Sequence, residues 1–130
     1  MSSTPLQFPA RGKPRAHAAF ALGRLKPGQM NGTEREYAQH LEALKATGCV
    51  LWYRFEGLKL RLADNTFYTA DFVVLPHTGV LELHEVKGHW QDDARAKIKI
   101  AAEQYPMRFI AVQKRRVKDG GGWSVEDFSE

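Results

Sequence analysis

Three charged residues stand within segments that are otherwise apolar and strand-like. Asp71 lies within Tyr-Thr-Ala-Asp-Phe-Val-Val-Leu, and Glu85 and Lys87 lie within Leu-His-Glu-Val-Lys-Gly. Side chains alternate along a strand, so Glu85 and Lys87 are expected to project from one face, which they share with Leu81 and Leu83. Charges in such surroundings are costly unless they are paired or bind a metal ion. The pattern therefore predicts a charged site where a buried strand meets a cleft.

Two carboxylates that converge on one point form a hard oxygen site. Mg²⁺ suits such a site because it keeps several waters and needs one or two protein carboxylates, and Mn²⁺ would substitute for it. The ion polarises a phosphate oxygen and acidifies a bound water. Lys87 would then orient or deprotonate that water, or stabilise charge on the phosphate. The set predicts phosphodiester hydrolysis, and the alternative is a plain Glu85–Lys87 salt bridge with Asp71 as an unrelated strand-end residue.

The elements that must position these residues follow from the periodicity of the chain. The ordered body starts near Asn31, and a helix capped by Thr33 and Glu36 is expected to run to Ala46. Strands are expected at 49–55, 58–62, 67–75, 80–87 and 107–113, a second helix at 92–105, and an edge strand or core cover at 123–128. Short turns favour antiparallel neighbours, whereas the intervening helix makes strands 80–87 and 107–113 parallel. The sequence thus predicts an α/β (α+β) fold with a central mixed β-sheet flanked by helices.

Length and composition restrict the class of protein. The 130 residues suffice for one domain, and 43% apolar and 26% charged residues are typical of a globular chain. The sequence has no apolar run long enough for a bilayer and no signal peptide, so no membrane partner is expected. The single cysteine, Cys49, cannot form an internal disulfide and is interpreted as a buried, inert thiol. A cytoplasmic location is therefore expected.

The positive charge is concentrated near the N-terminus. Residues 1–29 are interpreted as a basic arm punctuated by proline and glycine, with Arg11, Lys13 and Arg15 among its cations, and residues 30–130 as a single domain. A second basic cluster follows at 114–118. Such clusters suit a polyanion, most often nucleic acid, whereas a solvated tail that aids solubility is the alternative.

Ala70-Asp71 followed by Glu85-Val86-Lys87-Gly88 resembles the motif of the PD-(D/E)xK nuclease superfamily. The segments 31–38, 67–72 and 84–88 are similar to those of small phage and prophage endonuclease-like proteins. The resemblance covers residues 30–128, with Ala70 where the motif has proline. It implies a restriction-endonuclease-like core and a magnesium-dependent DNA endonuclease of phage or prophage origin, with a role in DNA recombination or repair.

The same resemblance suggests branched DNA or junctions as substrates and is compatible with a homodimer. The alternative is a phage protein that binds nucleic acid on a nuclease fold without cutting it.

The resemblance also implies roles for individual residues. Asp71, Glu85 and the backbone carbonyl of Val86 would hold the metal ion, with Lys87 as the catalytic cation. A further carboxylate is expected on the first helix, either Glu34 or Glu36, and it would act on the metal ion directly or through water.

We favour Glu34, because it shares the core-facing stripe with Tyr37, Ala38 and Leu41, whereas Glu36 fits the capping box with Thr33.

Several residues around this set could touch DNA. Arg95, Lys97 and Lys99 on the second helix either contact phosphate or form a solvated face. His89 and Trp90 follow the site and are better explained by a turn and by packing. Glu82 and His84 face away from Glu85 and are interpreted as surface or packing residues of the opposite face.

Overall fold

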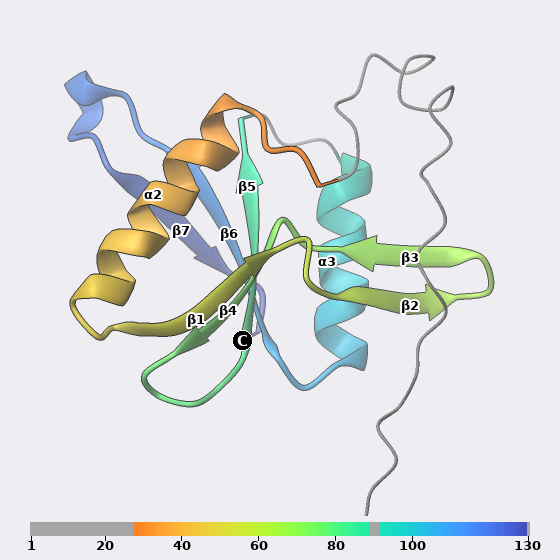
Figure 1. Ribbon diagram of the computed structural model, residues 1–130. Coiled ribbons are helices and arrows are strands. Elements are labelled where there is room, and N and C mark those ends of the chain that lie inside the picture. The colour runs from red at the N-terminus through yellow and green to blue at the C-terminus, as the bar shows by residue number, and fades with distance from the viewer. Residues whose placement is uncertain (1–27, 89–91, 130) are drawn as a thin grey trace, which may run out of the picture.

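The computed structural model describes residues 28–88 and 92–129. In these residues the chain forms two α-helices and seven strands, together with one short 3₁₀ helix (Figure 1). In chain order they are α2 (Gly32–Ala46), β1 (Val50–Phe55), β2 (Lys59–Ala63), β3 (Thr66–Thr69), β4 (Phe72–Pro76), β5 (Glu82–Lys87), α3 (Asp92–Gln104), β6 (Arg108–Lys114), η1 (Val117–Asp119) and β7 (Trp123–Asp127).

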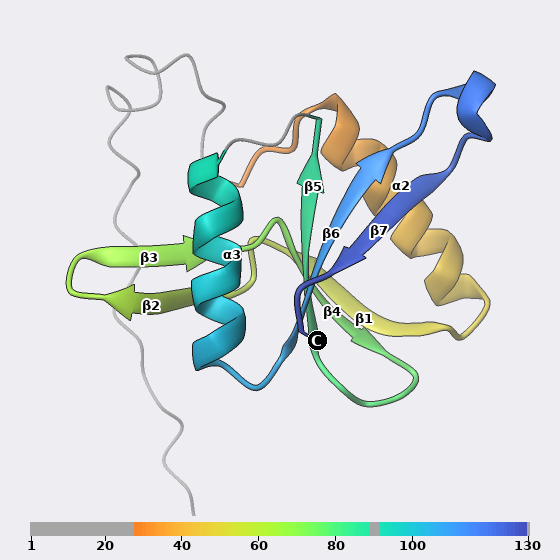
Figure 2. The ribbon, with the colours of Figure 1, turned by 180° about the vertical axis from the view of Figure 1, so that it is seen from behind.

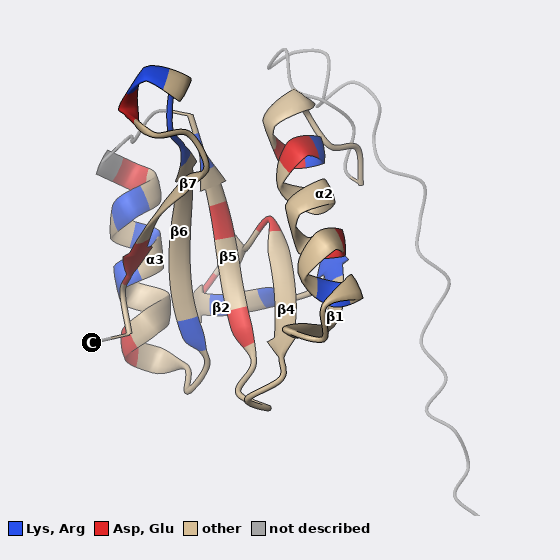
Figure 3. Ribbon diagram, turned by 90° about the vertical axis from the view of Figure 1, so that its left-hand side faces the viewer, with Lys and Arg blue, Asp and Glu red and all other residues tan. Residues whose placement is uncertain are grey.

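Five strands form a mixed sheet in the order β1-β4-β5-β6-β7. Strands β5 and β6 are parallel, with Glu85 opposite Ala111, and the other neighbours are antiparallel. Helix α3 makes the crossover between the two parallel strands, as the sequence predicts. The sheet stands between α2 on one side and α3 on the other (Figures 1 and 3). The predicted mixed sheet flanked by helices is confirmed, and β7 is the predicted edge strand.

The alternation of side chains along the central strands divides the core into two layers. Phe72 and Val74 of β4 pack under α2, where Tyr37 and Leu41 meet them. The intervening residue Val73 points to the other face and joins a second cluster with residues of α3. On β5 the same alternation places Leu83 toward α3, and so the face that Leu83 shares with Glu85 is the α3 face.

The N-cap of helix α2 lies two residues before the predicted one. Asn31 is the N-cap residue: its side chain accepts a hydrogen bond from the backbone N–H of Glu34 at 2.8 Å, and the Glu34 carboxylate accepts one from the N–H of Asn31. The predicted Thr33–Glu36 capping box is therefore wrong. Asparagine caps a helix at least as well as threonine, and Glu34 stands at the reciprocal third position after it.

The segment 67–75 forms two strands rather than the one predicted. Strand β3 pairs with β2 in a separate hairpin, whereas β4 joins the main sheet next to β1. The chain changes sheets at Asp71, whose carbonyl accepts a hydrogen bond from Glu56 N–H at 2.7 Å. Gly57 lets the chain pass close to β4, because a Cβ there would lie 2.5 Å from Val73 Cγ1. Asp71 thus stands at a junction between two sheets.

Cys49 is exposed, which contradicts the predicted buried thiol, because it precedes β1 in the turn that follows α2. Its reactivity would depend on solvent access rather than on packing. None of the helices in the described part of the chain is long and apolar enough to cross a bilayer.

Candidate active site

Glu85 and Lys87 project from the same face of β5, as their spacing predicts. Lys87 Nζ lies 3.0 Å from Glu85 Oε1, and both side chains are largely buried. Acidic positions of β5 appear as red bands along the central strand in Figure 3. This ion pair is equally expected if Glu85 and Lys87 form only a structural salt bridge. The side chains around the pair therefore determine which chemistry it can support.

The second oxygen of Glu85 has a partner that sequence reasoning missed. Tyr68 donates its hydroxyl to Glu85 Oε2 at 2.9 Å from the inner side of β3. Tyr68 is 7% exposed, and burial together with the Glu85 charge raises the pKa of its hydroxyl far above the usual value. Tyr68 is therefore a neutral donor that orients the carboxylate. Its alternation with Phe67 and Thr69 is the signal that could have placed it on the inner face.

Asp71 meets the end of β5 from the sheet junction. Its Oδ2 accepts a hydrogen bond from Val86 N–H at 2.8 Å, and Glu34 of α2 lies near enough to act on its charge. Burial raises the pKa of Asp71 to about 8, and the negative charges of Glu85 and Glu34 add to that rise against the Val86 hydrogen bond, which lowers it. Carboxylates that share one site resist simultaneous ionisation unless a cation balances them.

The helix carboxylate in this group is Glu34 rather than Glu36. Glu36 pairs with Lys114 Nζ at 2.6 Å on the exposed side of α2. Glu34 instead combines the capping hydrogen bond to Asn31 with its contact to Asp71. The preference for Glu34 agrees with this placement, although the capping role expected of Glu36 belongs to Glu34 itself.

The fit of this site to a metal ion depends on the number and the type of its donor atoms. In residues 28–88 and 92–129, no three His, Cys, Asp or Glu side chains are grouped as a ready-made metal site. Asp71 and Glu85 nevertheless offer carboxylate oxygens, the donors that Mg²⁺ prefers, and this ion needs one or two of them. An added cation would also offset the repulsion that raises the pKa of Asp71. The residues present fit Mg²⁺ on chemical grounds.

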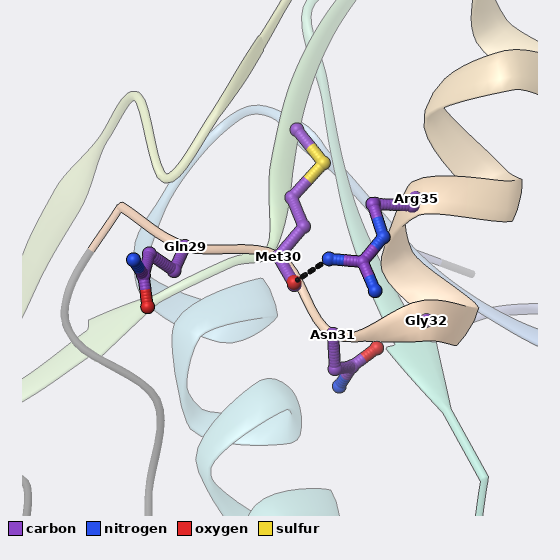
Figure 4. Close-up of a pocket in the computed structure, with 5 residues that line it drawn as sticks. All are labelled: Gln29, Met30, Asn31, Gly32 and Arg35. Atoms are coloured by element: carbon purple, nitrogen blue, oxygen red, sulfur yellow. Dashed lines mark hydrogen bonds between the residues drawn. The ribbon is translucent and has the colours of Figure 1, made fainter.

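A recess lies beside the first turn of α2, next to Glu34 in the chain. It encloses about 760 Å³ and is lined by Gln29, Met30, Asn31, Gly32 and Arg35 (Figure 4). Arg35 borders it with its guanidinium, which donates a hydrogen bond to the Met30 carbonyl at 2.9 Å. The recess thus has a positively charged side chain at its edge.

The three cations predicted on the second helix do not share one surface. Arg95 pairs with Glu126 and lies 5.4 Å from the centre of the Phe128 ring, so it is tied to the β7 side of the domain. Lys99 lines the same side as Arg95. Lys97 points to the hairpin instead, with Nζ 3.5 Å from the Phe67 carbonyl. Arg11, Lys13, Arg15, His89 and Trp90 lie outside the described residues.

The opposite face of β5 carries a second polar network that the sequence interpretation placed at the surface or in packing. His84 Nδ1 lies 2.6 Å from Tyr37 Oη, and its Nε2 lies 2.9 Å from Glu82 Oε1. Arg108 donates to the other oxygen of Glu82 at 2.9 Å and to Asp127 at 2.5 Å. Glu82 and His84 are both buried, so their place is the interior rather than the surface.

Comparison of the chain with protein-family models, with curated proteins and with solved structures finds no match. The site is therefore interpreted from its own geometry and chemistry.

Proposed function

We propose that this protein is a metal-dependent endonuclease that hydrolyses phosphodiester bonds in DNA. One observation carries the proposal: Asp71, from the sheet junction, accepts a hydrogen bond from the backbone between Glu85 and Lys87, and the charges of Glu85 and of Glu34 on the first helix turn both raise its pKa. A structural salt bridge needs Glu85 and Lys87 alone. It does not account for two further carboxylates whose charges oppose one another beside it.

Each residue has a role in this proposal. Asp71 and Glu85 would bind Mg²⁺, with the Val86 backbone carbonyl and Glu34, the latter through water, as further ligands. The bound ion would polarise the scissile phosphate and supply an acidified water. Lys87 would position that water or stabilise the charge on the phosphate, and Tyr68 would hold the Glu85 carboxylate in one orientation.

The resemblance to small phage endonuclease-like proteins supports branched DNA as the substrate and a phage or prophage origin. Action would then take place in the cytoplasm of a bacterial host, and a homodimer would cut the two strands of a junction symmetrically. The second candidate is a nucleic-acid-binding phage protein without cleavage activity. In such a protein the Glu85–Lys87 ion pair would be a structural salt bridge.

A cleavage panel tests the proposal. Labelled linear duplex, single-stranded, flapped and four-way DNA are incubated with the full chain and Mg²⁺, Mn²⁺ or Ca²⁺. We expect cleavage with Mg²⁺ and Mn²⁺, and none with Ca²⁺, because its larger and looser coordination misplaces the attacking water. Cleavage that survives exhaustive chelation with EDTA would overturn the metal mechanism, and binding of every substrate without cleavage would favour the second candidate.

A matched pair of helix variants locates the activity. Glu34→Gln removes the carboxylate beside Asp71, whereas Glu36→Gln removes one that pairs with Lys114 on the outside of the same helix. We expect the first variant to lose cleavage and the second to keep it. Equal activity of the two would remove Glu34 from the proposed site.

A further inference from the structure

The β2–β3 hairpin has two chemically different faces. Leu60 and Tyr68 point inward, are buried, and belong to the core cluster beside α3. Lys59, Arg61 and Phe67 alternate with them and are exposed on the outer face. The hairpin lies against α3 on one side, as the front and back views show (Figures 1 and 2). Its outer face is therefore turned away from the helix that supports it.

The outer face brings cations together around an aromatic ring. Lys59 Nζ lies 4.5 Å from the centre of the Phe67 ring, and that ring is 41% exposed. Arg61 stands directly opposite Phe67 in the hairpin register. Lys97 approaches the same residue from α3, with Nζ 3.5 Å from its carbonyl. The acidic residue of the hairpin, Asp64, lies in the turn at its tip, beyond these cations.

The same strand that carries this face leads into the proposed active site. Lys59 is opposite Thr69, and Thr69 is two residues before Asp71. Two residues of extended chain span at most about 7 Å, and directly opposite residues lie about 5 Å apart. Lys59 is thus within roughly 12 Å of Asp71, and Arg61 lies two residues farther out. Because each strand of a duplex carries one phosphate per ~3.4 Å of helix axis, one bound strand would reach both cations.

We propose that the outer face of the β2–β3 hairpin, with Lys59 and Arg61, binds the phosphate backbone of duplex DNA next to the Asp71–Glu85 site. This inference rests on the proposed function and adds the surface that holds the substrate. Phe67 contributes by keeping the Lys59 ammonium over the outer face through its ring. Tyr68, on the inner face of the same strand, links the surface mechanically to Glu85.

Salt-dependent binding tests this surface. Affinity of the full chain for a short labelled DNA duplex is measured in EDTA over a range of salt concentrations, for wild type, Lys59→Gln, Arg61→Gln and the control Lys45→Gln. Lys45 is an exposed lysine in the last turn of α2 and lies outside the hairpin. Each phosphate contact contributes about −0.9 to the slope of log affinity against log salt concentration. We expect Lys59→Gln and Arg61→Gln each to reduce the slope by about 0.9, and Lys45→Gln to leave it unchanged.

The outcomes distinguish this inference from the proposed function. Wild-type affinity and slope in both hairpin variants would overturn the surface, and so would an equal loss in the Lys45 control. If the wild-type protein cleaves DNA and the hairpin variants bind as it does, the proposed nuclease function stands and the hairpin is not its DNA-binding surface. Binding that depends on Lys59 and Arg61 without any cleavage would retain the surface and refute the nuclease. Thermal unfolding of each variant confirms that a lost exposed charge has not unfolded the domain.

Discussion

The two faces of strand β5 carry polar networks that differ in how their charges are balanced. Toward α2, His84 lies between Tyr37 and Glu82, and Arg108 supplies a cation to Glu82. Each of these groups meets a partner from within the chain. Such a network ties a helix to a sheet and needs nothing from outside the molecule.

Toward α3 and the hairpin the balance is different. Lys87 pairs with Glu85, and the pKa of Asp71 is raised to about 8 by burial and by the negative charges of Glu85 and Glu34. All buried side-chain nitrogen and oxygen atoms in the described residues have hydrogen-bond partners, so the difference lies in charge and not in unmade hydrogen bonds. Under the proposed function, the first face has a structural role and the second would take up an added cation.

The largest expected effect on the cleavage rate comes from removing the carboxylate charge of Glu85, with removal of the Glu82 charge on the opposite face as the control. Glu85→Gln should lower the cleavage rate by more than about 100-fold, because loss of a metal ligand exceeds the 10–100-fold that loss of a ligand's supporting partner causes. Glu82→Gln should cleave at close to the wild-type rate below its unfolding temperature. Cleavage assays on both folded variants check this, and equal losses would erase the functional distinction between the faces.

Two buried tyrosines provide a smaller and closely matched comparison. Tyr68→Phe removes the donor to Glu85, whereas Tyr37→Phe removes the partner of His84. Each loss of a buried hydrogen bond should destabilise the domain by about 1–3 kcal/mol. Tyr68→Phe should also weaken metal binding about 10–100-fold, because Glu85 loses its orienting partner. Urea unfolding and metal titration of both variants measure the two effects, and unchanged metal binding in Tyr68→Phe would limit Tyr68 to packing.

The smallest effect is a difference in the pH dependence of stability without metal. The folded pKa of Asp71, about 8, lies above its ordinary value, so its contribution is complete at acidic pH and is lost as the pH rises through 4 to 8. Asp71→Asn should remove that decline, which is on the order of a few kcal/mol. Urea midpoints measured in EDTA from pH 4 to 9 would show a flatter curve for the variant, and parallel curves would contradict the cause given for the raised pKa.

Asp127, in the network on the other face, supplies the opposite sign as a control. It is partly desolvated, but hydrogen bonds from Arg108 and Ser129 outweigh that burial and lower its pKa. Its stabilising contribution is therefore present above its ordinary pKa and lost as the pH falls below it. Asp127→Asn should reduce the loss of stability at acidic pH, whereas Asp71→Asn should reduce the loss of stability as the pH rises toward 8.

The fold could be predicted from the sequence because the patterns that indicate its helices and strands are local. Periodic apolar residues indicated both helices, and the helix between two apolar strands required the parallel pair. The break at Asp71 was not accessible, because Phe67 to Leu75 keeps an unbroken strand-like composition and tertiary contacts alone divide it. The exposure of Cys49 was missed for a related reason, since its apolar neighbours do not show on which side of the turn it lies.

The candidate site could be predicted from the sequence only in part. The alternation of Glu85 and Lys87 and the stripe that contains Glu34 are one-dimensional patterns. The structure places Glu85 and Lys87 on one face of β5, and the charge of Glu34 raises the pKa of Asp71. The hydrogen bond from Tyr68 depends on how the hairpin folds onto β5, which no spacing within the sequence encodes. The same holds for the Tyr37–His84–Glu82 chain, whose members come from a helix and a strand far apart in sequence.

Substitution of Lys87 provides the most direct test of the central claim, because the nuclease interpretation and the salt-bridge interpretation of the Glu85–Lys87 pair disagree about it. Calorimetric titration with Mg²⁺ or Mn²⁺ is combined with cleavage of labelled DNA for wild type, Lys87→Ala and Asp71→Ala. The account predicts that Lys87→Ala binds the metal ion at least as tightly as wild type, because a repelling charge is gone, and yet fails to cut DNA. Asp71→Ala should lose both properties. Cleavage by Lys87→Ala at the wild-type rate would show that the pair is a structural salt bridge and would contradict the account.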